Sequence, residues 1–141
     1  MKIVVPLDLS PTAEAAIGPA IELARALGDE IVLVTVTERK LERELQDFAE
    51  VEHARVPELI ANSLESMAAT LDGLAAGTEM LPSDDAAEAI VDYATADRAR
   101  MIVMATHGRS GVSRWRMGSV AERVVRHSTV PVLVVPAREP A

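Results

Sequence analysis

The chain has 141 residues, of which 49% are hydrophobic and 2% are aromatic, and its formal net charge is −8 at pH 7. This length suits one domain, residues 1–141, whose core must consist of aliphatic side chains. The acidic balance argues against nucleic acid as a partner, because phosphate backbones are bound by basic surfaces. We find no apolar run long enough for a membrane span or a signal peptide, and no cysteine, so we expect a cytoplasmic protein without disulfides.

The first half of the chain alternates between apolar runs and helical patterns. Residues 3–7 form an apolar run typical of a strand, and Ser10-Pro11 predicts the start of a helix that ends at Gly28. Residues 31–36 are apolar at every position, which is typical of a strand covered by helices on both faces of its sheet. A helical pattern then covers residues 51–74, and Gly77 is expected to stop it.

The second half of the chain continues this alternation. We predict a weak strand at residues 78–81 and two further strands at residues 100–105 and 130–135. Two capping motifs predict the starts of the intervening helices: Ser83-Asp84-Asp85, and Ser119 with Glu122 three residues later.

This order of elements predicts an α/β fold, an open parallel sheet of five strands with helices on both faces. If the first three strands wind one way from the first strand and the last two wind the other way, the strand order is 3-2-1-4-5. Ligands of such sheets bind beyond the carboxyl ends of the strands, at the switch point, which here lies between the first and fourth strands. We therefore expect a ligand site where residues 8 and 105 come together.

The stretch from residue 101 to residue 119 carries the clearest functional signal. An apolar strand gives way to small residues, and Gly108 and Gly118 enclose nine residues before the last helix starts. A loop that leads into a helix offers free N–H groups and the positive end of the helix dipole to an anion such as phosphate. The alternative is that these glycines form ordinary turns and that Ser119 only caps its helix.

Residues 107–127 contain five arginines and a single acid, which also favours an anionic ligand. Arg109 lies in the loop, whereas Arg123 and Arg126 lie on the predicted helix and can equally form a solvated, salt-bridged surface. At the end of the first strand, Asp8 can bind a ribose, a base or a metal, or can cap the turn into the first helix. Val36, at the end of the second strand, can offer its backbone to a base.

Several classes of enzyme are disfavoured. The chain has neither a Walker A sequence nor a G-x-G-x-x-G motif after the first strand, which argues against a P-loop NTPase and a dinucleotide-dependent dehydrogenase. We find no nucleophile–base pair and no spacing of ligands typical of a dedicated metal site.

Three segments together resemble the universal stress protein family, and the resemblance covers essentially the whole chain. They are residues 5–10, residues 105–108 with Gly118-Ser119 nine residues later, and residues 130–135. The members of that family that bind ATP carry the motif G-x2-G-x9-G-[ST]. This sequence matches it at Gly108, Gly118 and Ser119 and has Ala105 at the first glycine position.

The resemblance implies a Rossmann-like domain, similar to the adenine nucleotide alpha hydrolases, that binds ATP, ADP or AMP, often with a divalent ion such as Mg²⁺ at the phosphates. It implies a role in stress response or regulation, with at most weak hydrolysis. By position it assigns to the site Pro6, Leu7, Asp8, Val36, Met104, Ala105, Gly108, Gly118, Ser119, Val120 and Ala121. The charge of Arg109 adds this residue to the set.

Two other functions remain open on the sequence. One is a slow ATPase or phosphotransferase that uses the same loop; the arginines suit charge stabilisation, but no residue stands out to orient a nucleophile. The other is a dimeric interaction module that binds no nucleotide. Whichever function holds, the apolar last strand lies at an edge of the predicted sheet, and proteins seldom leave such an edge exposed to solvent. We therefore predict a homodimer that pairs through residues 130–136.

Overall fold

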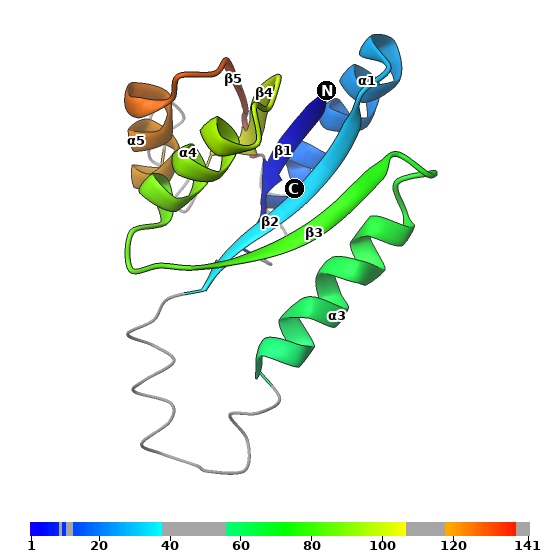
Figure 1. The fold of residues 1–141 in the computed structure, drawn as a ribbon, viewed down its shortest axis with the longest axis horizontal. Coiled ribbons are helices and arrows are strands. Elements are labelled where there is room, and N and C mark those ends of the chain that lie inside the picture. The colour runs from blue at the N-terminus through cyan, green and yellow to red at the C-terminus, as the bar shows by residue number, and fades with distance from the viewer. Residues whose placement is uncertain (9, 11–12, 38–55, 107–117, 138–141) are drawn as a thin grey trace.

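The computed structural model describes residues 1–8, 10, 13–37, 56–106 and 118–137 (Figure 1). Its elements in chain order are β1 (Lys2–Pro6), a 3-10 helix η1 (Ala13–Ala16), α1 (Ile17–Leu27), β2 (Glu30–Thr37), α3 (Val56–Ala69), β3 (Ala75–Pro82), α4 (Ala86–Ala96), β4 (Met101–Ala105), α5 (Ser119–His127) and β5 (Val132–Val135). Within these residues no helix has the length and hydrophobicity that a membrane span requires.

The strands form one parallel sheet of order β3-β2-β1-β4-β5, so the predicted fold class and strand order are confirmed. Helices α1 and α3 pack on one face of the sheet, and α4 and α5 pack on the other (Figure 1). All the strand pairs are parallel, so the carboxyl ends of all five strands meet at one edge.

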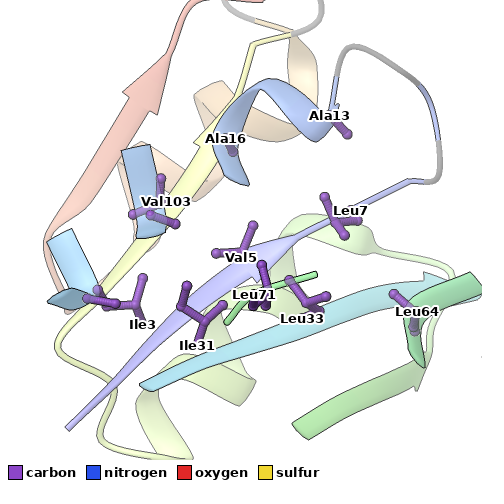
Figure 2. Close-up of a cluster of buried hydrophobic side chains, with 12 residues drawn as sticks. Ile3, Val5, Leu7, Ala13, Ala16, Ile31, Leu33, Leu64, Leu71 and Val103 are labelled. Atoms are coloured by element: carbon purple, nitrogen blue, oxygen red, sulfur yellow. The ribbon is translucent and has the colours of Figure 1, made fainter. Parts of the chain in front are cut away.

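The core explains why the central strands are apolar at every position. Side chains alternate between the two faces of a strand, so Ile3 and Val5 join the cluster under α1 and α3, whereas Val4 joins the cluster under α4 and α5. All three side chains are fully buried. Figure 2 shows the first cluster, in which Ile31 of β2 and Val103 of β4 flank the side chains of β1.

The first helix begins with a turn of 3-10 helix rather than directly after Ser10. The N–H of Ala13 donates to the carbonyl of Ser10 (3.2 Å) and to its hydroxyl (3.3 Å), and Pro11 lies outside the described residues. The predicted end is confirmed, because Gly28 has φ 70° and its N–H donates to the carbonyl of Ala24.

The helix before β3 ends at Ala69, earlier than predicted, and β3 starts at Ala75. Gly77 was expected to stop the helix, but it lies inside the strand. There the register shifts, since Ile31 pairs with Ala75 and Val32 pairs with Gly77. Glycine suits this bulge because it adopts φ 157° without a steric penalty. The β propensity of residues 75–77 is low, so pairing with β2 decides the conformation here.

The two helices on the other face begin in different ways. Asp85 caps α4 as predicted, because its Oδ1 accepts the N–H of Glu88 (3.1 Å). The predicted capping box at Ser119 is wrong, because Ser119 is the first helical residue of α5. The N-cap is Gly118, which has no side chain to accept a hydrogen bond.

A buried carboxylate joins three strands at the amino edge of the sheet. The side chain of Asp29, directly before β2, is 1% exposed, and it accepts hydrogen bonds from Nε and Nη2 of Arg100, directly before β4 (3.1 Å for Nη2). The amino group of Met1, directly before β1, donates to the same carboxylate (3.0 Å). Hydrogen bonding by Arg100, helped by the amino group, holds the pKa of Asp29 below its ordinary value despite burial.

Candidate functional site

Strands β1 and β4 separate toward their carboxyl ends. The ladder between them includes only the pairs Ile3–Met101 and Val4–Ile102, whereas β1 pairs with β2 along its whole length. This separation lies at the switch point of the sheet, where the connections from β1 and β4 leave in opposite directions.

A cavity of about 260 Å³ occupies this position. Predicted site residues that line it are Pro6, Leu7, Asp8, Val36, Met104, Ala105, Val120 and Ala121. These residues come from the ends of β1, β2 and β4 and from the first turn of α5, so four segments that are distant in sequence meet around one space. Most of the lining side chains are aliphatic, as the scarcity of aromatic residues requires.

The remaining predicted residues lie elsewhere or outside the described part of the chain. Gly118 and Ser119 precede Val120 at the start of α5, but neither lines the cavity, and Ser119 is exposed. Gly108 and Arg109 lie outside the described residues. Their place in the site therefore stays a prediction.

Five further residues line the cavity that were not predicted from the sequence: Ala13, Val34, Ala86, Ile90 and Thr106. Ala86 and Ile90 lie one turn apart on α4, whose N-terminus reaches the carboxyl edge of the sheet. The signal that could have identified them was the predicted topology, because in an α/β sheet the helix after each strand starts at that edge.

Asp8 caps a turn and lies at the cavity. Its Oδ1 accepts the backbone N–H of Ser10 (2.9 Å) and also the hydroxyl of Ser10, so the interpretation as a turn-capping residue is confirmed. The side chain is exposed and also lines the cavity. The turn thus fixes the position of a carboxylate at the rim of the cavity.

The backbone of Val36 points toward the cavity side of β2. Along a parallel strand, the N–H and C=O of alternate residues point to the same neighbouring strand. The carbonyl of Val34 accepts the N–H of Leu7 on the β1 side (2.8 Å), and the carbonyl of Thr37 accepts the N–H of Ser83 on the β3 side (2.9 Å). The peptide groups of Val36 therefore face the β1 side, beyond the last residue pair of the β1–β2 ladder, Pro6–Val34.

The arginines of α5 form ion pairs. Nη1 and Nη2 of Arg123 donate to the two oxygens of Asp85 (2.8 and 2.7 Å), and Arg126 pairs with Glu122 on its own helix (2.8 Å). The interpretation of these two arginines as a salt-bridged surface is confirmed. Hydrogen bonding by Arg123, followed by that of the Glu88 N–H, holds the pKa of Asp85 below its ordinary value.

The fold and the cavity define an α/β protein with a ligand-sized space at the switch point of a five-stranded parallel sheet. The model of the universal stress protein family matches residues 1–136, and this chain belongs to that family. Universal stress protein MJ0531 of Methanocaldococcus jannaschii is 35% identical to it over 144 residues, which cover 95% of this chain and 81% of that protein.

Two solved structures illustrate the structural similarity. Protein MJ0577 of the same organism has a TM-score of 0.79 and 26% identity, with 99% of this chain and 97% of that chain covered. A universal stress protein from Archaeoglobus fulgidus, solved in complex with dAMP, has a TM-score of 0.67 and 26% identity, with 95% and 96% of the two chains covered.

Proposed function

We propose that this protein binds an adenine nucleotide, ATP or its products ADP and AMP, in the cavity between β1 and β4. The observation that carries the proposal is the lining of that cavity: aliphatic walls, a carboxylate held at the rim by the Asp8 turn, and the first turn of α5. The dAMP complex of the Archaeoglobus fulgidus relative supports the choice of ligand.

Each part of the lining suits one part of a nucleotide. In this proposal the base lies between aliphatic side chains and bonds to the backbone of Val36, whose N–H and C=O match a ring with both a donor and an acceptor on one edge. The ribose hydroxyls donate to Asp8. The phosphates lie at the N-terminus of α5 near Gly118 and Ser119, and Gly108 and Arg109 complete their surroundings.

Mg²⁺ accompanies the phosphates in this proposal. The described residues contain no group of three acidic or histidine side chains that could hold a metal ion. We therefore propose that the phosphate oxygens and water supply most of the ligands of the ion, as is usual for Mg²⁺ bound with nucleotides.

The role that we propose is regulatory, in the cytoplasm and in stress response. Bound nucleotide would change the contacts of a homodimer that pairs through residues 130–136. This interface is supported by the position of β5 at the edge of the sheet and by Leu133, which is 40% exposed on that strand.

Equilibrium binding of ATP to the wild type and to two matched variants tests the proposed ligand. Ala86→Leu adds a large side chain to the cavity wall, and Ala96→Leu makes the same change at an exposed position on the same helix. Leucine is a good helix former, so α4 is preserved in both variants. We expect submillimolar affinity in the wild type, a loss of about ten-fold in Ala86→Leu, and unchanged affinity in Ala96→Leu.

A wild type without submillimolar affinity for ATP would contradict the proposal and would favour the interaction module that binds no nucleotide. Titration with GTP checks the base, since guanine carries a donor and an acceptor in the opposite order to adenine on the edge facing Val36. Equal affinity for GTP and ATP would argue against the bonds to the Val36 backbone.

A further inference from the structure

The ion pair between Asp85 and Arg123 joins the two helices that frame the cavity. Asp85 is the N-cap of α4, and Arg123 lies in the second turn of α5. Both oxygens of the carboxylate accept from the guanidinium (2.8 and 2.7 Å), and one of them also accepts the N–H of Glu88. One carboxylate thus fixes the start of α4 and its distance from α5.

The pair lies next to the residues of α4 and α5 that line the cavity. Beside the pair, Ala87 and Ile90 of α4 share a buried cluster with Ala121 and Val124 of α5. Ile90 and Ala121 of this cluster also line the cavity, as does Ala86, next to Asp85. A cavity removes dispersion contacts on one side of this packing, and the ion pair adds a polar contact that joins the same two helices.

The geometry of the pair suits this task. Two parallel hydrogen bonds from a planar guanidinium fix both distance and orientation, which a single contact or a lysine ammonium does not do. Hydrogen bonding by Arg123 lowers the pKa of Asp85, as expected for a carboxylate held by this guanidinium. The side chains of Asp85 and Arg123 are 32% and 51% exposed, so we expect the pair to contribute little to global stability.

We propose that Arg123 is a positioning residue: through Asp85 it holds the N-terminal ends of α4 and α5 at a fixed spacing and thereby slows the release of nucleotide from the cavity. The part about release rests on the proposed function, whereas the spacing is a property of the protein without ligand. A preformed cavity avoids the entropic cost of ordering its walls on binding, so loosening it weakens binding without removing any contact with the ligand.

Two conservative substitutions separate the geometry of the pair from its charge and from the cap. Arg123→Lys keeps the positive charge and loses the planar fork. Asp85→Asn keeps an oxygen that caps α4 and loses the ion pair. The matched control is Arg126→Lys, which alters an ion pair of similar length that stays within α5.

We expect the dissociation rate of ATP to rise about three- to ten-fold in Arg123→Lys and in Asp85→Asn. The double variant Arg123→Lys/Asp85→Asn should release ATP no faster than the faster of the two single variants, because both changes break the same interaction. The dissociation rate of ATP in Arg126→Lys should equal that of the wild type. The urea midpoint should be nearly the same in all the proteins, which distinguishes positioning from a general loss of stability.

Spin labels measure the spacing without ligand. The chain has no cysteine, so Glu88→Cys and Ser119→Cys, both exposed, give one specific pair of labels across the two helices. The distance distribution should broaden when Arg123→Lys or Asp85→Asn is added and should stay the same with Arg126→Lys.

The two measurements separate the failure of this inference from the failure of the proposed function. A wild type that binds ATP, with dissociation rates and label distances unaffected by Arg123→Lys, would overturn the inference. A wild type that does not bind ATP would overturn the proposed function. In that case the label distances alone decide whether the pair sets the spacing, and an unchanged distribution would overturn it.

Discussion

Asp8 illustrates how one side chain both ends a strand and shapes the rim of the cavity. Its carboxylate accepts the N–H of Ser10 two residues later, which turns the chain out of the sheet directly after β1. The same turn holds the carboxylate at the separation of β1 and β4, where it lines the cavity. The turn and the proposed binding role therefore use the same local geometry, and a substitution must be chosen to separate them.

Asp8→Asn makes this separation, because asparagine keeps an oxygen for the N–H of Ser10 but carries no charge. We expect an unchanged urea midpoint and an affinity for ATP that is lower by about ten-fold, since hydrogen bonds to charged acceptors are stronger than those to neutral ones. Calorimetric titration measures the affinity. Ser10→Ala is the control: it removes the hydroxyl that donates to Asp8 and accepts the N–H of Ala13, but it leaves the carboxylate, so it should retain the affinity of the wild type. Equal losses in both variants would mean that only the turn matters.

Among single residues, those at the ends of strands could be predicted from the sequence as part of the candidate site. Asp8 and Ala105 could be predicted because each ends an apolar run, and parallel strands bring such ends to one edge. Ala13 could not, because its position depends on how η1 folds back over that edge, and Ile90 follows only from the topology that brings the start of α4 there. The local pattern predicts Ser119 as the cap, but the cap lies one residue earlier, at Gly118, and Ser119 is the first helical residue.

At the level of elements, α3 shows how burial of one helix face decides its contribution to stability. Leu64 is 1% exposed and packs in the cluster between α1, α3 and the sheet, whereas Leu59 on the same helix is 61% exposed. Helix propensity and residue type are the same for both, so packing alone distinguishes them.

Leu64→Ala should lower the free energy of unfolding by about 2–5 kcal/mol, because it removes buried methyl groups and leaves a cavity. Leu59→Ala should change it by less than about 0.5 kcal/mol. Urea unfolding followed by circular dichroism measures both. Similar destabilisation by the two substitutions would show that α3 packs with a different face toward the sheet.

The carboxylate of Asp29 links the amino ends of β1, β2 and β4, and its lowered pKa makes stability depend on pH. Because the pKa is below 3.8 in the folded protein, the unfolded chain takes up a proton first as the pH falls. The stabilisation is complete above the unfolded pKa and is lost as the pH falls through the folded pKa.

Arg100→Gln removes the main cause of this shift and leaves a buried carboxylate with a weaker partner. We expect a lower urea midpoint than in the wild type at pH 7, and we expect the difference to shrink as the pH is lowered below about 4. Lys2→Gln serves as the control, because its pair with Asp97 is far more exposed and should matter little. A difference that stays constant from pH 7 to pH 3 would show that Arg100 does not act through the ionisation of Asp29.

The sequence predicted the existence and order of the elements better than their limits. The central strands were clear because burial on both faces makes them apolar throughout, whereas β3 starts three residues before its predicted start, because Ala75, Ala76 and Gly77 have low β propensity and give no strand pattern. Hydrogen bonding to β2 determines that segment, and no local pattern records it.

On the scale of the whole molecule, the two edges of the sheet differ. The β3 edge carries Glu79, Pro82 and the bulge at Gly77, and charges, prolines and bulges all discourage pairing with another chain. The β5 edge is short and apolar, with Leu133 exposed. We therefore expect β5 rather than β3 to pair with a second copy of the chain.

Leu133→Lys tests this interface. It places a charge on the β5 edge, where the proposed partner strand would have to bury it. We expect the wild type to sediment as a dimer at roughly tens of micromolar, a concentration at which weak interfaces of about 1,200 Å² would dissociate, and we expect Leu133→Lys to sediment as a monomer. Leu59→Lys, which adds the same charge to an exposed position on α3, should remain dimeric.

The same variant also shows whether nucleotide binding requires the dimer. The lining of the cavity comes from β1, β2, β4, η1, α4, α5 and the residues next to them, and β5 contributes none of the described lining residues. A monomeric Leu133→Lys protein should therefore bind ATP with the affinity of the wild type. Loss of binding in this monomer would mean that dimerisation shapes the cavity. A wild type that is itself monomeric at tens of micromolar would contradict the proposed interface, because an apolar edge that remains unpaired at that concentration does not drive association.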